Sequence, residues 1–120
     1  MAFARWVLTI AGVFGVLTVA PMFALEGAFS RGTPLSHPEH YYGFAAVTLA
    51  WQLTYLFIAR DPARYRPIIL LGAAGKLMFV VAVWSLYAAG RTPLPVALFT
   101  LADLVIAGLF VAASARLGRA

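Results

Sequence analysis

The apolar run from Pro67 to Ala89 constrains the fold of this chain more than any other stretch, because it is long enough to cross a bilayer. Its one formal charge, Lys76, lies near the middle of the run. An unpaired ammonium in lipid is costly and usually needs a partner of opposite charge. The partner that the sequence offers is Asp103, inside the next apolar run. The sequence therefore predicts two membrane helices joined by Lys76 and Asp103.

The composition also indicates a membrane protein. Hydrophobic residues make up 63% of the 120 residues and charged residues 11%, against roughly 45 to 50% and about 25% in soluble domains. Spans of about 20 residues each fill this length with four crossings and short loops. We therefore expect an all-α fold, an integral membrane four-transmembrane-helix bundle with up-down-up-down topology, in a single transmembrane domain over residues 1–120. The expected spans are residues 5–25, 41–59, 67–89 and 95–115.

The first apolar run has a second interpretation, a cleaved signal peptide, because Arg5 precedes it. The run continues past the usual length of about 7 to 15 residues to Leu25, with no clear A-x-A site before Glu26. We therefore favour an uncleaved first span. Pro21 should kink or loosen its end, because proline lacks a backbone donor. A stripe of mostly small residues suits close helix packing and comprises Ala11, Gly15, Thr18 and Met22.

The start of the second span carries a capping pattern. Ser36 is the expected N-cap, Pro38 lies in the first turn, and Glu39 reaches back to the Ser36 amide. Farther along the span, small and polar residues share one helical face, which in lipid should turn inward. The residues of this face are Ala45, Thr48, Gln52, Tyr55 and Ala59.

The arginines divide unevenly between the two sides of a four-span chain. Because positive residues favour the cytoplasmic side of short loops, we expect both termini and the connection 60–67 to be cytoplasmic. Arg60, Arg64 and Arg66 in this connection are interpreted as a topology signal that contacts lipid phosphates rather than as a ligand site. The same side also holds Arg5, Arg116 and Arg119, and the opposite side holds Arg31 and Arg91.

Lys76 and Asp103 are the charged members of a predicted cluster of polar residues inside the spans. On an insertion scale the strongly apolar residues of the 67–89 run supply roughly 3 to 6 kcal/mol, against about 2.5 to 3.5 kcal/mol for one central lysine. Each of the two helices should therefore insert only marginally and benefit from pairing with the other. The predicted intramembrane cluster comprises Lys76, Asp103, Gln52, Thr48, Tyr55 and Thr100.

Three interpretations of the Lys76 and Asp103 charges stay open. The first, which we favour, is a structural ion pair that fixes the register of two helices. The second is a proton or ion relay, or the counter-charge of a small substrate, since intramembrane charges often mark transport paths. In the third, the two charges never meet and Lys76 extends its stem toward the interface.

The outer loop holds a separate group of candidates. His37 and His40 are three residues apart at a helix start, so they can share a face, and with Glu39 they can be read as a metal or proton site. The alternative, which we favour, is a capped helix entrance with two solvated imidazoles. Glu26 ends the first span and is expected at the interface, with a position facing the bundle as its alternative.

Several function classes find no support in the sequence. The chain has no cysteine, which excludes disulfides, thiolate catalysis and cysteine-ligated metals. It has no glycine-rich phosphate loop, H-E-x-x-H or G-x-S-x-G motif, and no histidine inside a span to ligate haem. The net charge of +5 sits at the ends of apolar runs, which indicates lipid head groups rather than nucleic acid. We therefore expect no catalytic residue, no metal and no cofactor.

The second half of the chain carries one further pattern. Its residues are Trp51-Gln52, Ala59-Arg60-Asp61-Pro62, Arg64, Arg66-Pro67 and Lys76. This pattern resembles that of a family of small, uncharacterised four-helix proteins of the bacterial inner membrane. The resemblance implies the fold and an inner (plasma) membrane location, and it implies no activity.

The sequence thus predicts a multi-pass membrane protein that acts as a non-enzymatic structural or accessory component. Its expected partners are the lipid bilayer and either further copies of itself, as a homo-oligomer, or a larger membrane complex. The alternative is a small transporter or ion-coupled carrier that uses Lys76, Asp103 and Gln52. A membrane enzyme acting on a lipid or quinone is the third hypothesis.

Overall fold

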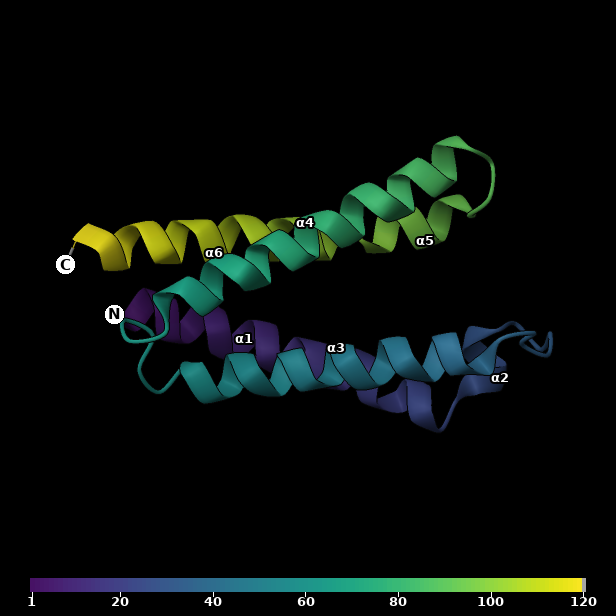
Figure 1. Ribbon diagram of the computed structural model, residues 1–120, viewed down its shortest axis with the longest axis horizontal. Helices are drawn as coiled ribbons and strands as arrows, with labels where there is room; N and C mark the ends of the chain where they lie inside the picture. Colours follow the sequence, from purple (N-terminus) through teal and green to yellow (C-terminus); the bar gives the residue numbers. More distant parts are fainter. Residues whose placement is uncertain (120) are drawn as a thin grey trace. The chain divides into compact units, whose positions relative to one another are not determined.

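The computed structural model describes residues 1–119, and over these residues the chain is helical with no strand (Figure 1). The N-terminal half contains α1 (Ala2–Val19), the 3-10 helix η1 (Ala20–Phe23), α2 (Glu26–Phe29) and α3 (Pro38–Ile58). The C-terminal half contains α4 (Arg66–Ala88), α5 (Leu94–Phe99) and α6 (Leu101–Arg119). The predicted all-helical fold is therefore confirmed.

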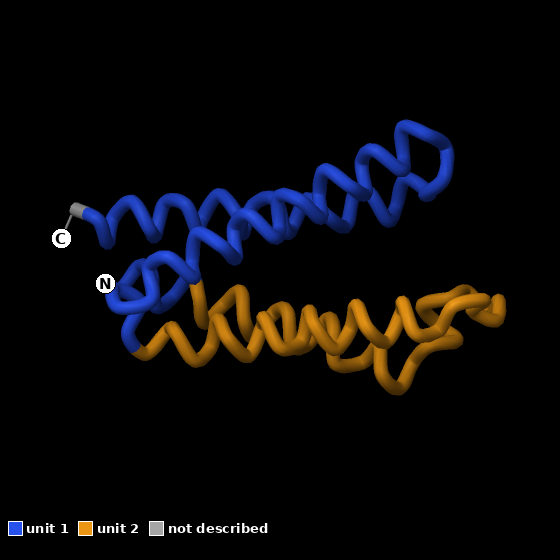
Figure 2. Tube along the Cα trace, in the orientation of Figure 1, with its two compact units in different colours: residues 1–7, 61–120 blue, residues 8–60 orange. Residues whose placement is uncertain are grey.

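The chain divides into two compact units, which Figure 2 shows in different colours. The α4–α6 unit contains residues 1–7 and the chain from residue 61 onward. The α1–α3 unit contains Leu8–Arg60, so α1 begins in one unit and continues in the other. The expectation of a single transmembrane domain stays a prediction.

The α4–α6 unit is a hairpin of two long helical segments that lie side by side (Figure 1). Buried residues on both segments recur every three or four positions, the spacing of a packed helical seam. Lys76 and Asp103 fall on these two stripes, so they are members of the seam. Its other buried residues include Ile69, Ala73, Val80 and Val83 on α4, and Thr100, Ala107, Phe110, Ser114 and Leu117 on the segment facing it.

A left-handed glycine closes the hairpin turn. Gly90 has a φ of 75°, which a residue with a Cβ adopts only at a cost. The Gly90 amide donates to the Tyr87 carbonyl, and the Arg91 amide donates to the Leu86 carbonyl, both at 2.9 Å. This is the Schellman pattern of hydrogen bonds, which satisfies the last carbonyls of a helix. It ends α4 and allows the chain to turn back toward α5.

In the α1–α3 unit, α3 packs antiparallel against α1 and η1. Gly15 of α1 lies against the side chain of Gln52. Nearer the start of α3, the Tyr41 hydroxyl donates to the Met22 carbonyl at 2.7 Å. Later residues of the first helix thus meet earlier residues of α3. The predicted small-residue stripe therefore lies on the face that packs against this helix.

The end of the first apolar run behaves as Pro21 predicts. The α-helix stops at Val19 and continues as the tighter 3-10 helix η1, with Pro21 in its first turn. Proline removes a backbone donor and clashes with the preceding turn, so the regular ladder ends there.

Three helical segments of the described chain are long and apolar enough to cross a membrane. They are Ala2–Phe23, Arg66–Ala88 and Leu94–Gly118. α3 has 21 residues but is not among them, and its polar positions include Gln52. These findings are consistent with a membrane protein that has three candidate spans. A fourth span through α3 stays a prediction.

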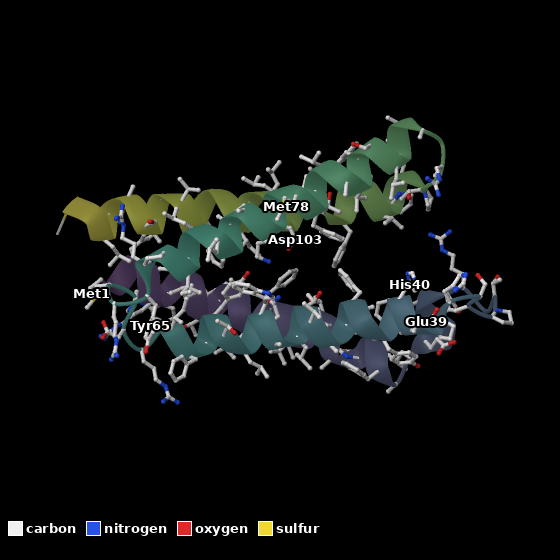
Figure 3. All side chains as sticks on the ribbon, viewed as in Figure 1. Met1, Glu39, His40, Tyr65, Met78 and Asp103 are labelled. Atoms are coloured by element: carbon white, nitrogen blue, oxygen red, sulfur yellow. The ribbon has the colours of Figure 1, made fainter. Side chains whose placement is uncertain are left out.

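Large apolar side chains are exposed on all the long helices. Leu17 is 70% exposed, Val47 62%, Met78 68% and Val105 63%, and Met78 is labelled in Figure 3. Soluble monomers rarely expose apolar surface so widely, because water disfavours it. A lipid environment removes this cost.

The predicted capping box at the second span is wrong. α3 begins at Pro38, its N-cap is His37, and no side chain caps this end. The physical reason is that proline disfavours the helical conformation in the residue before it. His37 accordingly has a non-helical backbone, with φ −134° and ψ 72°, so the helix starts one residue later than a Ser36 cap requires. Glu39 lies beside His37 instead.

Candidate functional site

The Lys76 and Asp103 side chains meet inside the α4–α6 unit. Lys76 Nζ donates a hydrogen bond to Asp103 Oδ1 at 3.0 Å, so the two form a salt bridge. Their side chains are only 11% and 20% exposed, and Asp103 can be located in Figure 3. The pairing expected from the sequence is therefore present. It contradicts the interpretation in which the two charges never meet.

A break in the helix places Asp103 near a helix start. α5 ends at Phe99, Thr100 follows as its C-cap, and α6 begins at Leu101 with Asp103 in its first turn. Asp103 therefore lies three residues after Thr100, in the first turn of α6.

Trp84 connects the break to the neighbouring helix. Trp84 Nε1 donates to Thr100 Oγ1 at 3.0 Å, and Thr100 Oγ1 donates to the Ala97 carbonyl at 2.7 Å. Thr100 is 1% exposed, so its hydroxyl needs such partners. These two bonds stabilise the interruption and hold it against α4.

Arg66 links the opposite ends of the same two helices. Its Nε donates to the Ser114 carbonyl at 2.8 Å, and its guanidinium lies beside Gly118. A cation in this position also interacts favourably with the negative C-terminal end of α6. With the two pairs described above, α4 is joined to the α5–α6 segment near its start, at its middle and near its end.

The other three predicted cluster residues lie in the α1–α3 unit. Gln52 is 4% exposed, and its Nε2 donates to the Thr48 carbonyl at 3.0 Å. Its Oε1 is buried and has no hydrogen-bond partner in the described part of the chain. Tyr55 is buried, with its ring 5.9 Å from that of Trp51. The structure thus buries Gln52 and Tyr55 on the predicted face, whereas their approach to Lys76 and Asp103 stays a prediction.

The outer-loop candidates form two groups of contacts. Glu26 begins α2, and its Oε1 accepts a hydrogen bond from the Tyr42 hydroxyl at 2.8 Å. His37 and His40 instead lie on either side of Glu39, at the start of α3, where Glu39 and His40 are labelled in Figure 3. All three of these side chains are exposed.

The basic connection between α3 and α4 combines arginines with aromatic rings. The Arg60 guanidinium lies 5.7 Å from the Phe57 ring, and that of Arg64 lies 5.5 Å from the Tyr65 ring. Such contacts hold a cation over an aromatic face. The sequence predicts the same lipid contact for Arg66, but its guanidinium reaches Ser114 of α6. Contact of Arg60 and Arg64 with lipid phosphates stays a prediction.

The sequence reasoning did not identify Trp84 and Arg66 as residues that join the helices. A usable signal existed for Arg66 alone. Once Lys76 is paired with Asp103 in an antiparallel hairpin, residues that precede Lys76 must face residues that follow Asp103. This register places Arg66 near Ser114, whereas it places Trp84 near Pro95 and does not indicate the contact with Thr100.

A charged pair beside an interrupted helix occurs both in structural helix pairs and at transport sites in membranes. Its role must therefore be argued from the residues of this chain. No family model, no curated protein and no solved structure matches this chain.

Proposed function

We propose that this chain is a multi-pass protein of the bacterial inner (plasma) membrane, with four spans and cytoplasmic N and C termini. We further propose that it acts as a non-enzymatic structural or accessory component. Its partners are then the lipid bilayer and either further copies of the chain or a larger membrane complex.

The packing of α3 supports the fourth span. Gln52 lies against Gly15, and Tyr41 bonds the Met22 carbonyl, so α3 follows the first helix back along much of its length. If the first helix crosses the bilayer, α3 must lie at the same depths. Its 21 residues match the length needed for a core about 30 Å thick.

Single-cysteine labelling tests this topology, because the chain has no cysteine of its own. We expect Thr33→Cys and Thr92→Cys to react with a membrane-impermeant maleimide in intact spheroplasts. We expect Ala63→Cys to react only after permeabilisation, because it lies in the arginine-rich connection that the positive-inside rule retains in the cytoplasm. The parent chain serves as the unlabelled control.

A three-span chain gives a different labelling pattern. If α3 stayed outside the bilayer, residues 33 and 63 would share one side and residue 92 would lie on the other. Thr33→Cys and Ala63→Cys variants that label from the same side would therefore overturn the four-span topology, and labelling of Ala63→Cys alone from outside intact spheroplasts would overturn the cytoplasmic position of the termini.

The observation that carries the structural role is the position of the Lys76–Asp103 pair between two other links. All three links join α4 to the α5–α6 segment. Sliding one helix by a turn, about 5.4 Å, separates the charges and breaks the other two hydrogen bonds together. Links of this kind fix the register of two apolar helices, whose contacts alone specify register weakly.

Reconstitution into lipid vesicles tests this role against a small transporter or ion-coupled carrier that uses Lys76, Asp103 and Gln52. We expect proton and monovalent-cation flux under an imposed gradient to be the same for the parent and for the double variant Lys76→Met/Asp103→Leu. A structural pair can be replaced by apolar residues without creating or removing a path. Flux in the parent that the double variant lacks would overturn the structural role and favour the transporter.

A further inference from the structure

Two imidazole rings and a carboxylate gather at the start of α3. Glu39 Oε1 lies 3.1 Å from His37 Nδ1 and 3.8 Å from His40 Nε2. The two imidazole ring centroids are 5.4 Å apart. One candidate ligand atom from each side chain can be chosen so that all three lie within 4.8 Å of one another. In residues 1–119 this is the one group of three histidine, cysteine or acidic residues with such spacing.

The backbone holds the three residues in this arrangement. Pro38 keeps His37 outside the helix, in a non-helical conformation. The His40 amide donates to the His37 carbonyl at 3.1 Å and closes the turn between the two histidines. Glu39 and His40 then belong to the first turn of a 21-residue helix. The group is therefore built on the end of a regular element.

We propose that His37, Glu39 and His40 bind a divalent first-row transition-metal ion of the Zn²⁺ class. Imidazole nitrogen and carboxylate oxygen are established zinc ligands, and two histidines with one glutamate leave a fourth position for water. Copper(II) and nickel(II) also suit imidazole ligands, whereas Mg²⁺ and Ca²⁺ prefer sites made of oxygen alone.

The distances are compatible with this ion. Ligands at the usual zinc distances of about 2.0 to 2.2 Å in a tetrahedron are about 3.3 Å apart. The two distances from Glu39 to the imidazoles, 3.1 and 3.8 Å, lie on either side of this value. The side chains of His37, Glu39 and His40 are 71%, 65% and 79% exposed. Packing therefore does not oppose the side-chain rotations that would bring the two imidazole nitrogens to the spacing of zinc ligands.

Calorimetric titration of the full chain with ZnCl₂ in detergent micelles tests the proposal, with any histidine tag removed. We expect one saturable Zn²⁺ site per chain and no binding of Mg²⁺. The double variant His37→Ala/His40→Ala is expected to lose this binding, because one carboxylate cannot replace two imidazoles. Glu39→Gln is expected to weaken the affinity at least 10-fold, about the least that loss of an outer-shell partner costs.

Glu26→Gln provides the matched control. It removes a carboxylate from the same outer region, but Glu26 bonds the Tyr42 hydroxyl and is outside the histidine group. Its Zn²⁺ affinity should equal that of the parent. Far-UV circular dichroism confirms that each variant stays helical. A parent chain without saturable Zn²⁺ binding, or a double histidine variant that binds as the parent does, would overturn the proposed site.

Discussion

Replacing Lys76 with methionine is expected to lower the free energy of unfolding by about 3 to 5 kcal/mol, because it strands a largely buried carboxylate. Asp103→Leu is expected to cost a similar amount, since it strands the ammonium instead. The double variant, with two apolar side chains in the seam, should recover most of the loss. Thermal and denaturant unfolding in detergent, followed by circular dichroism, measures all four proteins.

The four stabilities form a double-mutant cycle, which isolates the coupling between Lys76 and Asp103. Arg91→Met is the matched control, because it removes a cation from the exposed turn rather than from the seam, and its effect should stay within about 0.5 kcal/mol. Single variants as stable as the parent would mean that the two charges are hydrated. A double variant that loses as much stability as the two single variants added together would mean that the two charges are not coupled.

The seam of the α4–α6 unit was largely predictable from the sequence. Lys76 and Asp103 interrupt long apolar runs. An isolated charge in lipid is so costly that the two helices have few possible arrangements other than the one that pairs these residues. On the segment that carries Asp103, the buried residues Thr100, Ala107 and Ser114 recur with it at the spacing of one helical face. In both cases the signal is strong because a polar residue has to be accommodated within an apolar helix.

The interruption at Thr100 was not predictable by the same reasoning. Hydropathy treats residues 94–118 as one apolar segment, and threonine occurs in helices without breaking them. At the break, the Thr100 hydroxyl accepts a hydrogen bond from Trp84 on another helix. Such a contact follows from helix register, which the pattern of apolar residues does not encode.

The start of α3 also could not be predicted correctly from the residue pattern alone. The Ser36 pattern matched a capping box in residue type, but Pro38 changes which residue can be the N-cap. The preceding loop also contains left-handed residues, Arg31 with a φ of 56° and Gly32 with a φ of 78°. The conformation of this loop determines where the helix can start, and the capping pattern alone does not describe it.

Gly15→Ala is expected to destabilise the protein by about 1 to 3 kcal/mol, the usual cost of adding atoms to a packed contact. A Cβ at this position would overlap the carboxamide of Gln52. Gln52 cannot move away freely, because it is 4% exposed and its Nε2 is bonded to the Thr48 carbonyl. Alanine elsewhere in a helix is favoured over glycine by roughly 0.5 to 1 kcal/mol. A loss of stability on Gly15→Ala therefore indicates that the added Cβ overlaps the Gln52 side chain. Thermal unfolding in detergent measures it.

Gly75→Ala is the matched control for this substitution. Gly75 is also within a long helix, but a Cβ there would meet no atom within 4 Å. It should stabilise the protein by about 0.5 to 1 kcal/mol, because it removes backbone freedom from the unfolded chain.

Gln52→Ala should relieve the overlap at Gly15. The double variant Gly15→Ala/Gln52→Ala should therefore be more stable than the sum of the two single effects predicts. If Gly15→Ala stabilised the protein as Gly75→Ala does, α3 would not pack closely on the first helix, and the main support for its crossing of the membrane would be lost.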